Sequence, residues 1–244
     1  MTDPIRLSKL MSERGICSRR EADRYIEQGQ VQVDGLVIST LGTKVRPDAK
    51  ITLLPDAQSA QNKKITILLN KPLGFLSVHA EQGYPAAREL LTPDRYHGDP
   101  QVRATEIDGV DALGVAGRLD INSKGLLVFS DDGVVIKQII GPESGMEKEY
   151  LVRIAGTITT EILRKLSFGL FLDGKKLKRA TIDRLQPQVL RFVLREGKKR
   201  QIRRMCELVG LEVTSIKRVR IGKVMLGNLP LGQWRYLKES ESFR

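Results

Sequence analysis

The pattern of hydrophobic and polar positions over residues 5–54 predicts two helices. Apolar residues spaced by three and four positions indicate a short amphipathic helix that ends near Gly15. A capping box of Ser18 with Glu21 begins a second helix, which Gly29 can end. The apolar positions of the two helices are Leu7, Leu10, Met11, Ala22, Tyr25 and Ile26.

A hairpin is expected to follow the two helices. Val31 and Val33 alternate with polar residues and lead into Asp34-Gly35, a dipeptide typical of two-residue hairpin turns, before residues 36–38 return. The order helix, helix, hairpin predicts a small unit over residues 1–54.

Residues 55–63 lack apolar periodicity, and we expect them to be a linker. The larger domain would then cover residues 64–244. Its strand-like runs are 64–69, 113–115, 126–129, 150–154 and 189–194, and residues 159–168 have helical spacing. Short strands mixed with few helices, without regular alternation, predict an α+β domain built on a mixed or antiparallel central sheet.

Residues 92–113 form a polar stretch that contains proline and glycine and lies directly before a candidate carboxylate. Long loops in compact domains are often functional, so this segment is a candidate for substrate contact. A simple surface insertion is the alternative.

The composition indicates what kind of partner the protein binds. The formal net charge is +12, from 41 Lys and Arg against 29 Asp and Glu, which favours a polyanionic partner such as nucleic acid over a merely basic soluble protein. No apolar run is long enough to span a bilayer, and the N-terminus lacks a signal-peptide pattern, so we expect a cytoplasmic protein. Cys17 and Cys206 are then expected to be free and buried.

Basic side chains are crowded into the first unit, several of them on the non-apolar sides of its helices, where they could meet phosphates. These are Arg6, Lys9, Arg14, Arg19, Arg20 and Arg24. A solvated charged face is the alternative interpretation.

A second basic run covers residues 195–204, which contain six basic side chains and one acidic one. If the stretch to Val209 is a helix, Ile202, Met205 and Cys206 share one face with Val209. Arg200, Arg203 and Arg204 would then lie on the opposite face and point outward. The alternative is again a solvated helix.

Asp120 stands in Gly117-Arg118-Leu119-Asp120, after a strand-like run. Spacing alone is a weak signal, because a lone aspartate in a loop is more often a turn residue than a nucleophile. Other site types have less support. The two histidines, His79 and His97, are too few for a metal cluster or a serine-type triad, and the sequence contains no nucleotide-binding glycine motif.

Several runs together resemble a known family. Residues 116–120, 147–152 and 197–205 are similar to the three main motifs of bacterial RNA pseudouridine synthases, in the branch often called the RsuA/RluB/RluE/RluF family. Residues 70–74 resemble the opening of that catalytic domain, and residues 222–237 resemble its closing segment. Residues 6–9 and 15–23 resemble the αL RNA-binding module shared with a small-subunit ribosomal protein. Within the family, the chain is most similar to the RluF members.

The resemblance implies that a uridine in RNA is isomerised without a cofactor or a metal. The bond from ribose to the base nitrogen breaks, the uracil rotates, and a carbon–carbon glycosidic bond forms. Asp120 matches the catalytic aspartate, Tyr150 the aromatic residue beside the flipped base, and Arg203 the arginine paired with the aspartate. An adjacent guanidinium favours an ionised, oriented carboxylate, and an aromatic ring can replace the stacking that a flipped base loses.

The expected partner is RNA, with no membrane and no nucleotide cofactor, and we expect a monomer. By charge and position, Arg118 and Lys148 are expected to hold phosphates near the cleft. The other expected RNA-binding residues are Arg6, Lys9, Arg19, Arg20, Arg24, Lys198, Lys199, Arg200 and Arg204.

Three functions stay open at this point. The leading one is modification of large-subunit (23S) ribosomal RNA, and the second is the same chemistry on transfer RNA or small-subunit ribosomal RNA. The third is a non-catalytic RNA-binding or ribosome-assembly protein. Residues 92–113 form a longer loop than in the family. If this loop contacts RNA, the substrate could differ from that of the family members.

Overall fold

The computed structural model describes residues 3–81, 83–99, 109–141 and 143–244. The chain forms two compact units. The first comprises residues 1–66 together with 130–137, and the second comprises residues 67–129 together with 138–244.

The first unit begins with the two predicted helices, α1 (Leu7–Glu13) and α2 (Arg19–Glu27). The capping box is confirmed, since the Ser18 Oγ accepts from the Glu21 backbone N–H at 3.3 Å. The Glu21 carboxylate in turn accepts from the Ser18 backbone N–H at 2.9 Å. A buried cluster joins the helices to the strands that follow. It comprises Leu7, Met11, Cys17, Ala22, Tyr25, Ile26, Val31, Val33, Ala49 and Ala57.

The predicted hairpin is confirmed as β2 (Val31–Val33) and β3 (Leu36–Ile38). Asp34 and Gly35 have φ of 50° and 86°, as a two-residue turn with left-handed backbone requires. Strand β5 (Ile51–Leu53) pairs with the other edge of β2, and β1 (Ile5–Arg6) pairs with β4 (Lys44–Val45).

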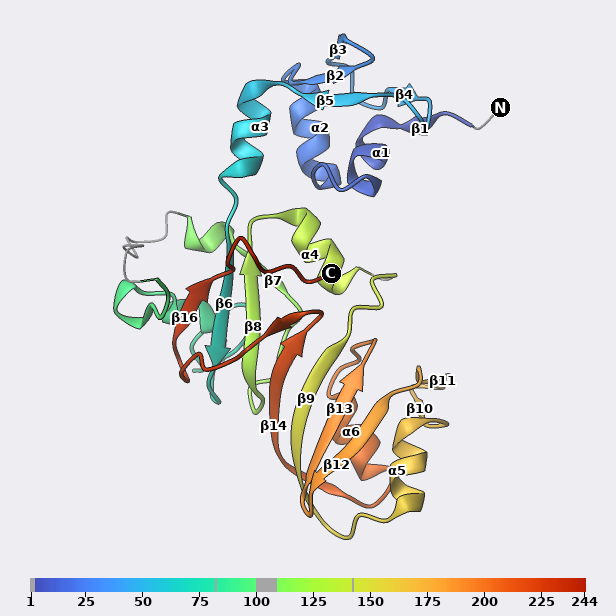
Figure 1. The fold of residues 1–244 in the computed structure, drawn as a ribbon, viewed down its shortest axis with the longest axis vertical. Coiled ribbons are helices and arrows are strands. Elements are labelled where there is room, and N and C mark those ends of the chain that lie inside the picture. The colour runs from blue at the N-terminus through green and yellow to red at the C-terminus, as the bar shows by residue number, and fades with distance from the viewer. Residues whose placement is uncertain (1–2, 82, 100–108, 142) are drawn as a thin grey trace. The chain divides into compact units, whose positions relative to one another are not determined.

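Residues 55–62, which we expected to lie in a linker, form helix α3 (Pro55–Asn62; Figure 1). Proline at the first helical position suits the helix start, because its missing N–H would have no partner there. The sequence of this helix has no apolar stripe, and Ala57 is its one buried residue. The Gln61 side chain donates to the Tyr25 hydroxyl at 3.0 Å and so fixes α3 to α2.

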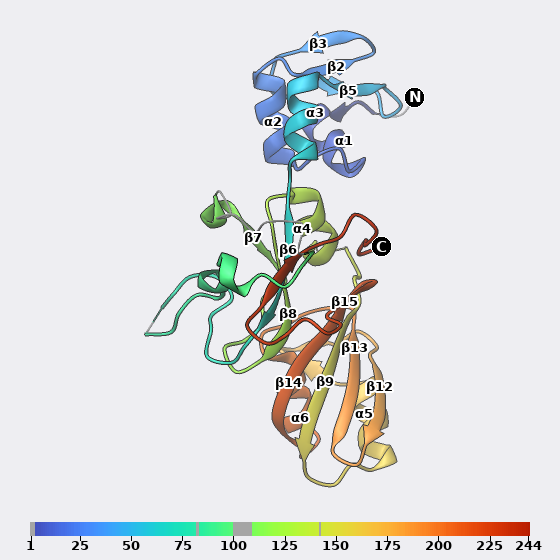
Figure 2. The same ribbon diagram turned by 60° about the vertical axis from the view of Figure 1, so that its left-hand side comes forward.

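The second unit is built on a mixed sheet in the order β12-β13-β9-β14-β8-β6-β16 (Figures 1 and 2). Strands β14 and β8 run parallel, whereas β12–β13, β13–β9, β9–β14 and β6–β16 are antiparallel. The α+β prediction is therefore confirmed. The strands are β6 (Thr66–Lys71), β8 (Lys124–Ser130), β9 (Lys148–Ala155), β12 (Thr181–Gln186), β13 (Val189–Leu194), β14 (Glu212–Ile221) and β16 (Trp234–Tyr236).

Four shorter strands complete the pairing in the described part of this unit. Strand β7 (Gly114–Ala116) pairs with β8, and β15 (Val224–Met225) pairs with β14. Strands β10 (Phe171–Leu172) and β11 (Lys175–Lys176) form a separate hairpin.

Helices α5 (Thr160–Ser167) and α6 (Gln201–Glu207) pack on one face of the β12–β13–β9–β14 region. Ile202, Met205 and Cys206 of α6 are buried there against Val152 and Phe192, as the helical spacing predicted. The opposite face of β9 carries the charged residues Glu149 and Arg153, and Glu149 binds both Arg191 and Arg220. Because side chains alternate along each strand, the other face of the sheet is left for the core and the candidate site.

The remaining segments include α4 (Gly133–Ile140) and the short 3-10 helices η1 (Ala87–Leu90), η2 (Pro93–Arg95) and η3 (Val110–Ala112). The middle of the polar loop at 92–113, residues 100–108, lies outside the described residues. Both cysteines are free and buried. Within the described ranges, no helix has the length and apolar content needed to cross a membrane.

Candidate active site

Asp120 lies in the connection between β7 and β8, at the centre of the second unit's sheet. Its side chain is half-buried, and its backbone carbonyl accepts from the Ser123 N–H at 3.0 Å in a tight turn. The carboxylate interacts electrostatically with two cations, Lys71 and Arg203. A partly exposed carboxylate between cations can attack, or stabilise, an electron-poor carbon of a bound substrate.

The residue before Asp120 is clamped by a buried serine. The Ser77 Oγ donates to the Leu119 carbonyl at 2.6 Å and accepts from the Leu119 N–H at 2.9 Å. Both backbone groups of Leu119 are thus bonded to one side chain, and Leu119 itself is buried. The Asp120 backbone therefore has little freedom to move.

Arg218 on β14 holds the other end of the loop. This side chain is 1% exposed, and its guanidinium donates to three carbonyls: Leu126 at 2.7 Å, Gly117 at 2.6 Å and Arg118 at 3.4 Å. Among the described residues, no carboxylate lies within ion-pair distance of it. Its role in the structure is to tie the segment before Asp120 to the sheet.

The close approach of β14 to β8 depends on Gly125. A Cβ on this residue would lie 2.2 Å from the Arg218 carbonyl oxygen, which is closer than any real Cβ contact. Its φ of 105° also disfavours other residues. Glycine at this position therefore permits the parallel pairing that brings Arg218 to the loop.

Tyr150 lies on β9 with Arg218 opposite it on β14 and Phe192 opposite it on β13. It shares a face with Val152, two residues along the strand, and packs against the same core cluster. Its side chain is half-buried. The ring therefore stands at the edge of the core, on the side of the sheet that carries Arg218.

Arg203 lies on α6 and is also half-buried. Its guanidinium donates to the carbonyls of Val213 at 3.0 Å and Asn122 at 2.8 Å, so it is hydrogen-bonded to the loop that carries Asp120. Within the described residues it makes no ion pair with Asp120. Burial lowers the pKa of Arg203 and Arg200 lowers it further, while Asp120 opposes both effects.

Lys71 was not predicted as a site residue, although it belongs to the run at 70–74 that resembles the family's opening motif. It is fully buried at the end of β6, and its Nζ donates to the carbonyls of Pro72 at 2.8 Å and Phe75 at 2.9 Å. Burial lowers its pKa to about 8, although Asp120 raises it. A lysine between Asn70 and Pro72, at the end of an apolar strand, was the available signal, but its burial could not be inferred.

Lys148 requires a correction. We expected it to hold a phosphate, but it is only 9% exposed, and its Nζ donates to the carbonyls of Ile139 at 3.1 Å and Met146 at 3.3 Å. Burial, followed by the charge of Arg218, lowers its pKa to about 8. This ammonium is thus enclosed by carbonyls of its own unit and is not the exposed cation that we expected.

The basic run at 195–204 also differs from the prediction, because α6 begins at Gln201 rather than near 195. Arg200 is the N-cap residue with φ of 52°, and the Glu196 carboxylate accepts from Gln201 and from the Lys178 N–H. The preceding residues therefore form a loop. Arg203, which we expected to point outward, instead donates to the Asn122 carbonyl in the Asp120 loop.

The other predicted RNA-binding cations of this unit fall into two groups. Arg118, Lys199 and Arg200 are exposed. Lys198 instead donates to the Leu172 carbonyl at 3.1 Å, and Arg204 makes a two-pronged ion pair with Asp173 at 3.0 and 2.6 Å. Lys198 and Arg204 therefore already bind other groups of the protein.

The predicted cations of the first unit are exposed, namely Arg6, Lys9, Arg19, Arg20 and Arg24. Lys9 is 3.6 Å from Glu13, and Arg24 lies over the Tyr25 ring at 5.3 Å. Arg14 has a structural role instead, because its guanidinium donates to the carbonyls of Ala49 and Pro47. Within the described parts of the chain, no group of His, Cys, Asp or Glu is arranged to hold a metal ion.

Comparison with family models gives two matches. Residues 65–208 match the RNA pseudouridylate synthase model, and residues 5–51 match the S4 domain model. These ranges coincide with the segments that carry the site and the exposed cations of the first unit.

Individual proteins show the same similarity. The chain is 38% identical to a dual-specificity RNA pseudouridine synthase RluF of Escherichia coli, over 97% of this chain and 77% of that protein. It is 30% identical to an uncharacterized RNA pseudouridine synthase of Aquifex aeolicus, over 97% and 92%. A crystal structure of a pseudouridylate synthase shares the fold, with a TM-score of 0.64, 24% identity and 97% of each chain covered.

Replacing Lys148 with Met tests whether Lys148 is a buried cation, because the effect of the replacement on stability should then depend on pH. Because the folded pKa of about 8 lies below the usual 10.5, the wild type binds fewer protons folded than unfolded between these values. Its stability should therefore rise, relative to Lys148→Met, by up to about 3 kcal/mol as the pH increases from 8 to 10.5. Urea unfolding of both proteins at several pH values measures this difference. A constant difference would show that Lys148 is not a buried cation.

Proposed function

The chain belongs to the RNA pseudouridylate synthase family, and from this premise we propose that it modifies large-subunit ribosomal RNA with Asp120 as its catalytic carboxylate. The reaction class itself follows from the family, because these proteins are isomerases that convert uridine in RNA to pseudouridine. The non-catalytic alternative is set aside on the same ground.

The observation that carries the assignment of Asp120 is how its loop is held. Ser77 bonds both backbone groups of Leu119, Arg218 binds the two carbonyls before it, and Arg203 binds the Asn122 carbonyl. The backbone on both sides of Asp120 is thus fixed, while its carboxylate is left half-exposed. A rigid backbone with an available side chain is what a positioned catalytic group requires.

In the proposed reaction Asp120 attacks, or stabilises, the C1′ carbon of the target ribose. The bond from C1′ to N1 of the uracil breaks, the uracil rotates within the site, and C5 forms the new bond to C1′. The proton on C5 leaves and N1 gains one, so the reaction is balanced without an oxidant, a reductant or a cofactor.

Tyr150 and Arg203 are proposed to assist from either side. The target base must leave its stack to reach Asp120, and the half-buried Tyr150 ring can replace part of the lost stacking. Arg203 supplies positive charge near the carboxylate and ties its loop to α6. Arg118, Lys199 and Arg200 are exposed cations of the same unit and are proposed to meet phosphates.

The first unit matches the S4 domain, and we propose that its exposed cations bind the RNA outside the target site. The RluF relatives are named dual-specificity enzymes, which supports more than one target uridine here, with transfer RNA as the alternative class of substrate. We further propose that the protein acts as a monomer in the cytoplasm.

Asp120→Asn tests the central assignment. The amide is similar in size but carries no charge, so turnover of a substrate RNA should fall by on the order of 10⁴-fold while RNA affinity changes little. Tritium release from C5-labelled uridine measures turnover, and a filter-binding assay measures affinity. Asp56→Asn, at an exposed position of α3 in the first unit, is the matched control and should retain activity. Normal turnover by Asp120→Asn would reject the assignment.

The role of the first unit is tested by changing Arg19, Arg20 and Arg24 to Gln together. Each lost phosphate contact removes about 0.7 from the slope of log affinity against log salt on single-stranded RNA, so the slope should decrease by about 2. Arg46→Gln is the control, because Arg46 is exposed in the same unit but paired with Asp34 at 3.3 Å. Equal slopes for the triple variant and the wild type would count against RNA binding by these residues.

Pseudouridine mapping decides the class of substrate. Ribosomal and transfer RNA from a deletion strain of the source organism should be compared with RNA from that strain carrying the wild-type gene or Asp120→Asn. We expect at least one pseudouridine of large-subunit ribosomal RNA to disappear on deletion and to return only with the wild-type gene. Loss confined to transfer RNA or to the small subunit would replace the proposed substrate.

A further inference from the structure

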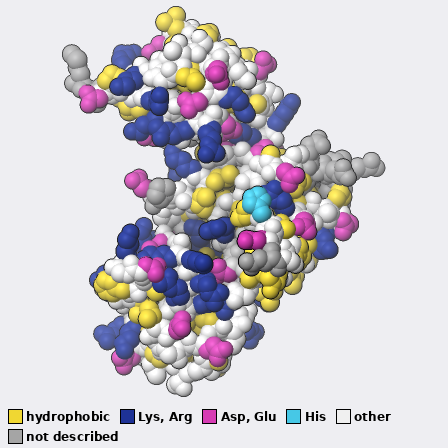
Figure 3. Space-filling view, turned by 180° about the vertical axis from the view of Figure 1, so that it is seen from behind, with side chains coloured by type: hydrophobic (Ala, Val, Ile, Leu, Met, Phe, Trp, Pro, Cys, Tyr) yellow, Lys and Arg dark blue, Asp and Glu magenta, His cyan; other side chains and the backbone are white. Residues whose placement is uncertain are grey.

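Residues 168–179, here called the basic hairpin, expose aromatic rings and cations together. They contain β10 and β11, and the side chains of Phe168 and Phe171 are 52% and 57% exposed. Exposed cations follow in close succession, namely Lys175, Lys176, Lys178 and Arg179. Figure 3 shows dark-blue Lys and Arg side chains close to yellow hydrophobic ones on the lower left of the molecule.

The hairpin is firmly held at its turn and through two buried leucines. Leu172 and Leu177 are buried in the core cluster shared with α5 and α6. The Asp173 carboxylate is bound by Arg204 at 2.6 and 3.0 Å, and the Lys198 Nζ donates to the Leu172 carbonyl. The exposed side chains are therefore presented from a fixed base and not from a loose loop.

The hairpin is also connected to the active site through α6. Arg204 of α6 and Lys198, just before α6, bind the hairpin. The neighbouring Arg203 of α6 binds the Asn122 carbonyl in the Asp120 loop. An RNA held by the hairpin would thus lie against the same helix that helps to position the catalytic loop. Lys199 and Arg200 extend the exposed positive charge between them.

The charge of the hairpin is not balanced from within. Asp173 is the one acidic residue of the sequence from 168 to 179, and Arg204 already binds it. Four exposed cations on a short segment are a match for a polyanion, since each phosphate contact releases counterions.

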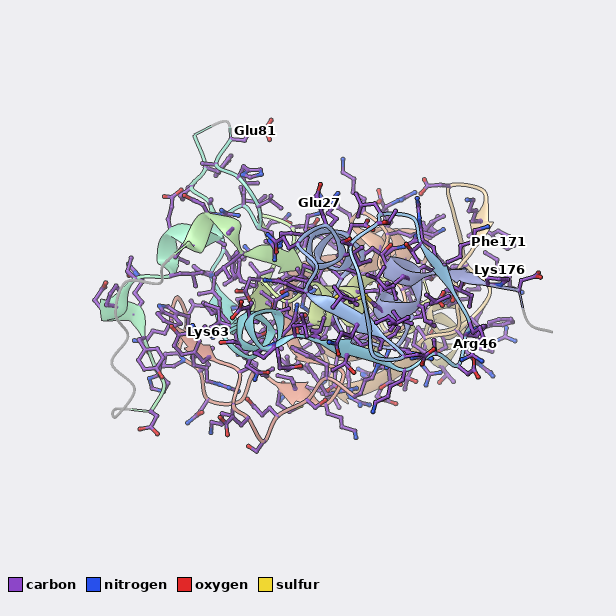
Figure 4. The ribbon with its side chains drawn as sticks, turned by 90° about the horizontal axis from the view of Figure 1, so that it is seen from above. Glu27, Arg46, Lys63, Glu81, Phe171 and Lys176 are labelled. Carbon is purple, nitrogen blue, oxygen red and sulfur yellow. The ribbon has the colours of Figure 1, made fainter. Side chains whose placement is uncertain are left out.

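The rings indicate which form of RNA is bound. Lys176 lies over the Phe168 ring at 4.2 Å and Arg179 lies 5.6 Å from it. Phe171 is the strand partner of Lys176, and Figure 4 labels the two next to each other; this pair lies farther from the turn of the hairpin than Leu172 and Lys175. In the described part of the chain, no cation or second ring stacks on Phe171. An exposed ring beside cations can stack on an unpaired base, which a base inside a duplex does not permit.

We propose that the basic hairpin binds a single-stranded segment of the substrate RNA, with a base stacked on Phe171 and phosphates held by Lys175, Lys176, Lys178 and Arg179. Phe168 offers a second ring if a base displaces Lys176. This inference rests on the proposed function, because it concerns the same RNA that the catalytic unit would modify.

The test measures binding of the full-length protein to two labelled RNAs, a 12-nucleotide single strand without secondary structure and a blunt duplex of the same length. The variants are Phe171→Leu and the pair Phe168→Leu with Phe171→Leu. Loss of one stacked base should weaken binding of the single strand by about tenfold and leave the duplex unchanged. Lys175→Gln with Lys176→Gln should lower the salt slope on the single strand by about 1.4.

Leu185→Ala is the matched control, because Leu185 is 52% exposed on β12 and outside the hairpin. Thermal unfolding of each variant checks that the fold is retained. If Phe171→Leu binds the single strand as tightly as the wild type, or loses the same factor on both RNAs, the inference is wrong. These measurements involve no turnover, so they can fail while Asp120 stays catalytic. Wild-type protein that binds neither RNA would instead contradict the proposed function.

Discussion

The candidate active site depends on one buried cation, Arg218, which has no carboxylate partner among the described residues. Arg218 places its guanidinium among three carbonyls, two of which belong to the loop that carries Asp120 and one to β8. Removing a buried charged donor would leave these carbonyls unpaired, which costs about 1–3 kcal/mol for each group. This one side chain thus ties the loop that carries the Asp120 carboxylate to the parallel strand pair. Ser77 adds a second point of attachment from another segment.

Much of the fold could be predicted because local chemistry determined it. The Ser18–Glu21 capping box and the Asp34–Gly35 turn are short patterns with a direct physical basis, and both are present. Helix α3 was missed because its stability relies on Pro55 at the start and one buried alanine, Ala57, and not on an apolar stripe. The start of α6 was placed too early because helical spacing does not reveal the left-handed backbone of Arg200.

The site was harder to predict, since charge in the sequence does not indicate burial. Asp120, Tyr150 and Arg203 were named through the family resemblance, and the structure brings Asp120 and Arg203 into electrostatic range. In the sequence, Lys148 cannot be distinguished from an exposed lysine, yet its ammonium is enclosed by carbonyls. Lys71 and Arg218 were missed for the same reason, because long-range contacts decide which cations become part of the interior.

Gly125 links the position of the candidate site to the folding of the sheet, and this affects how a loss of activity in a variant would be interpreted. Any side chain there would force β14 away from β8, and Arg218 would move with it. A substitution that loosens this strand pair would therefore inactivate the enzyme before the whole unit unfolds. Inherited or engineered variants in β8 and β14 would then resemble catalytic mutants in an activity screen, although they change neither Asp120 nor any residue proposed to bind the RNA.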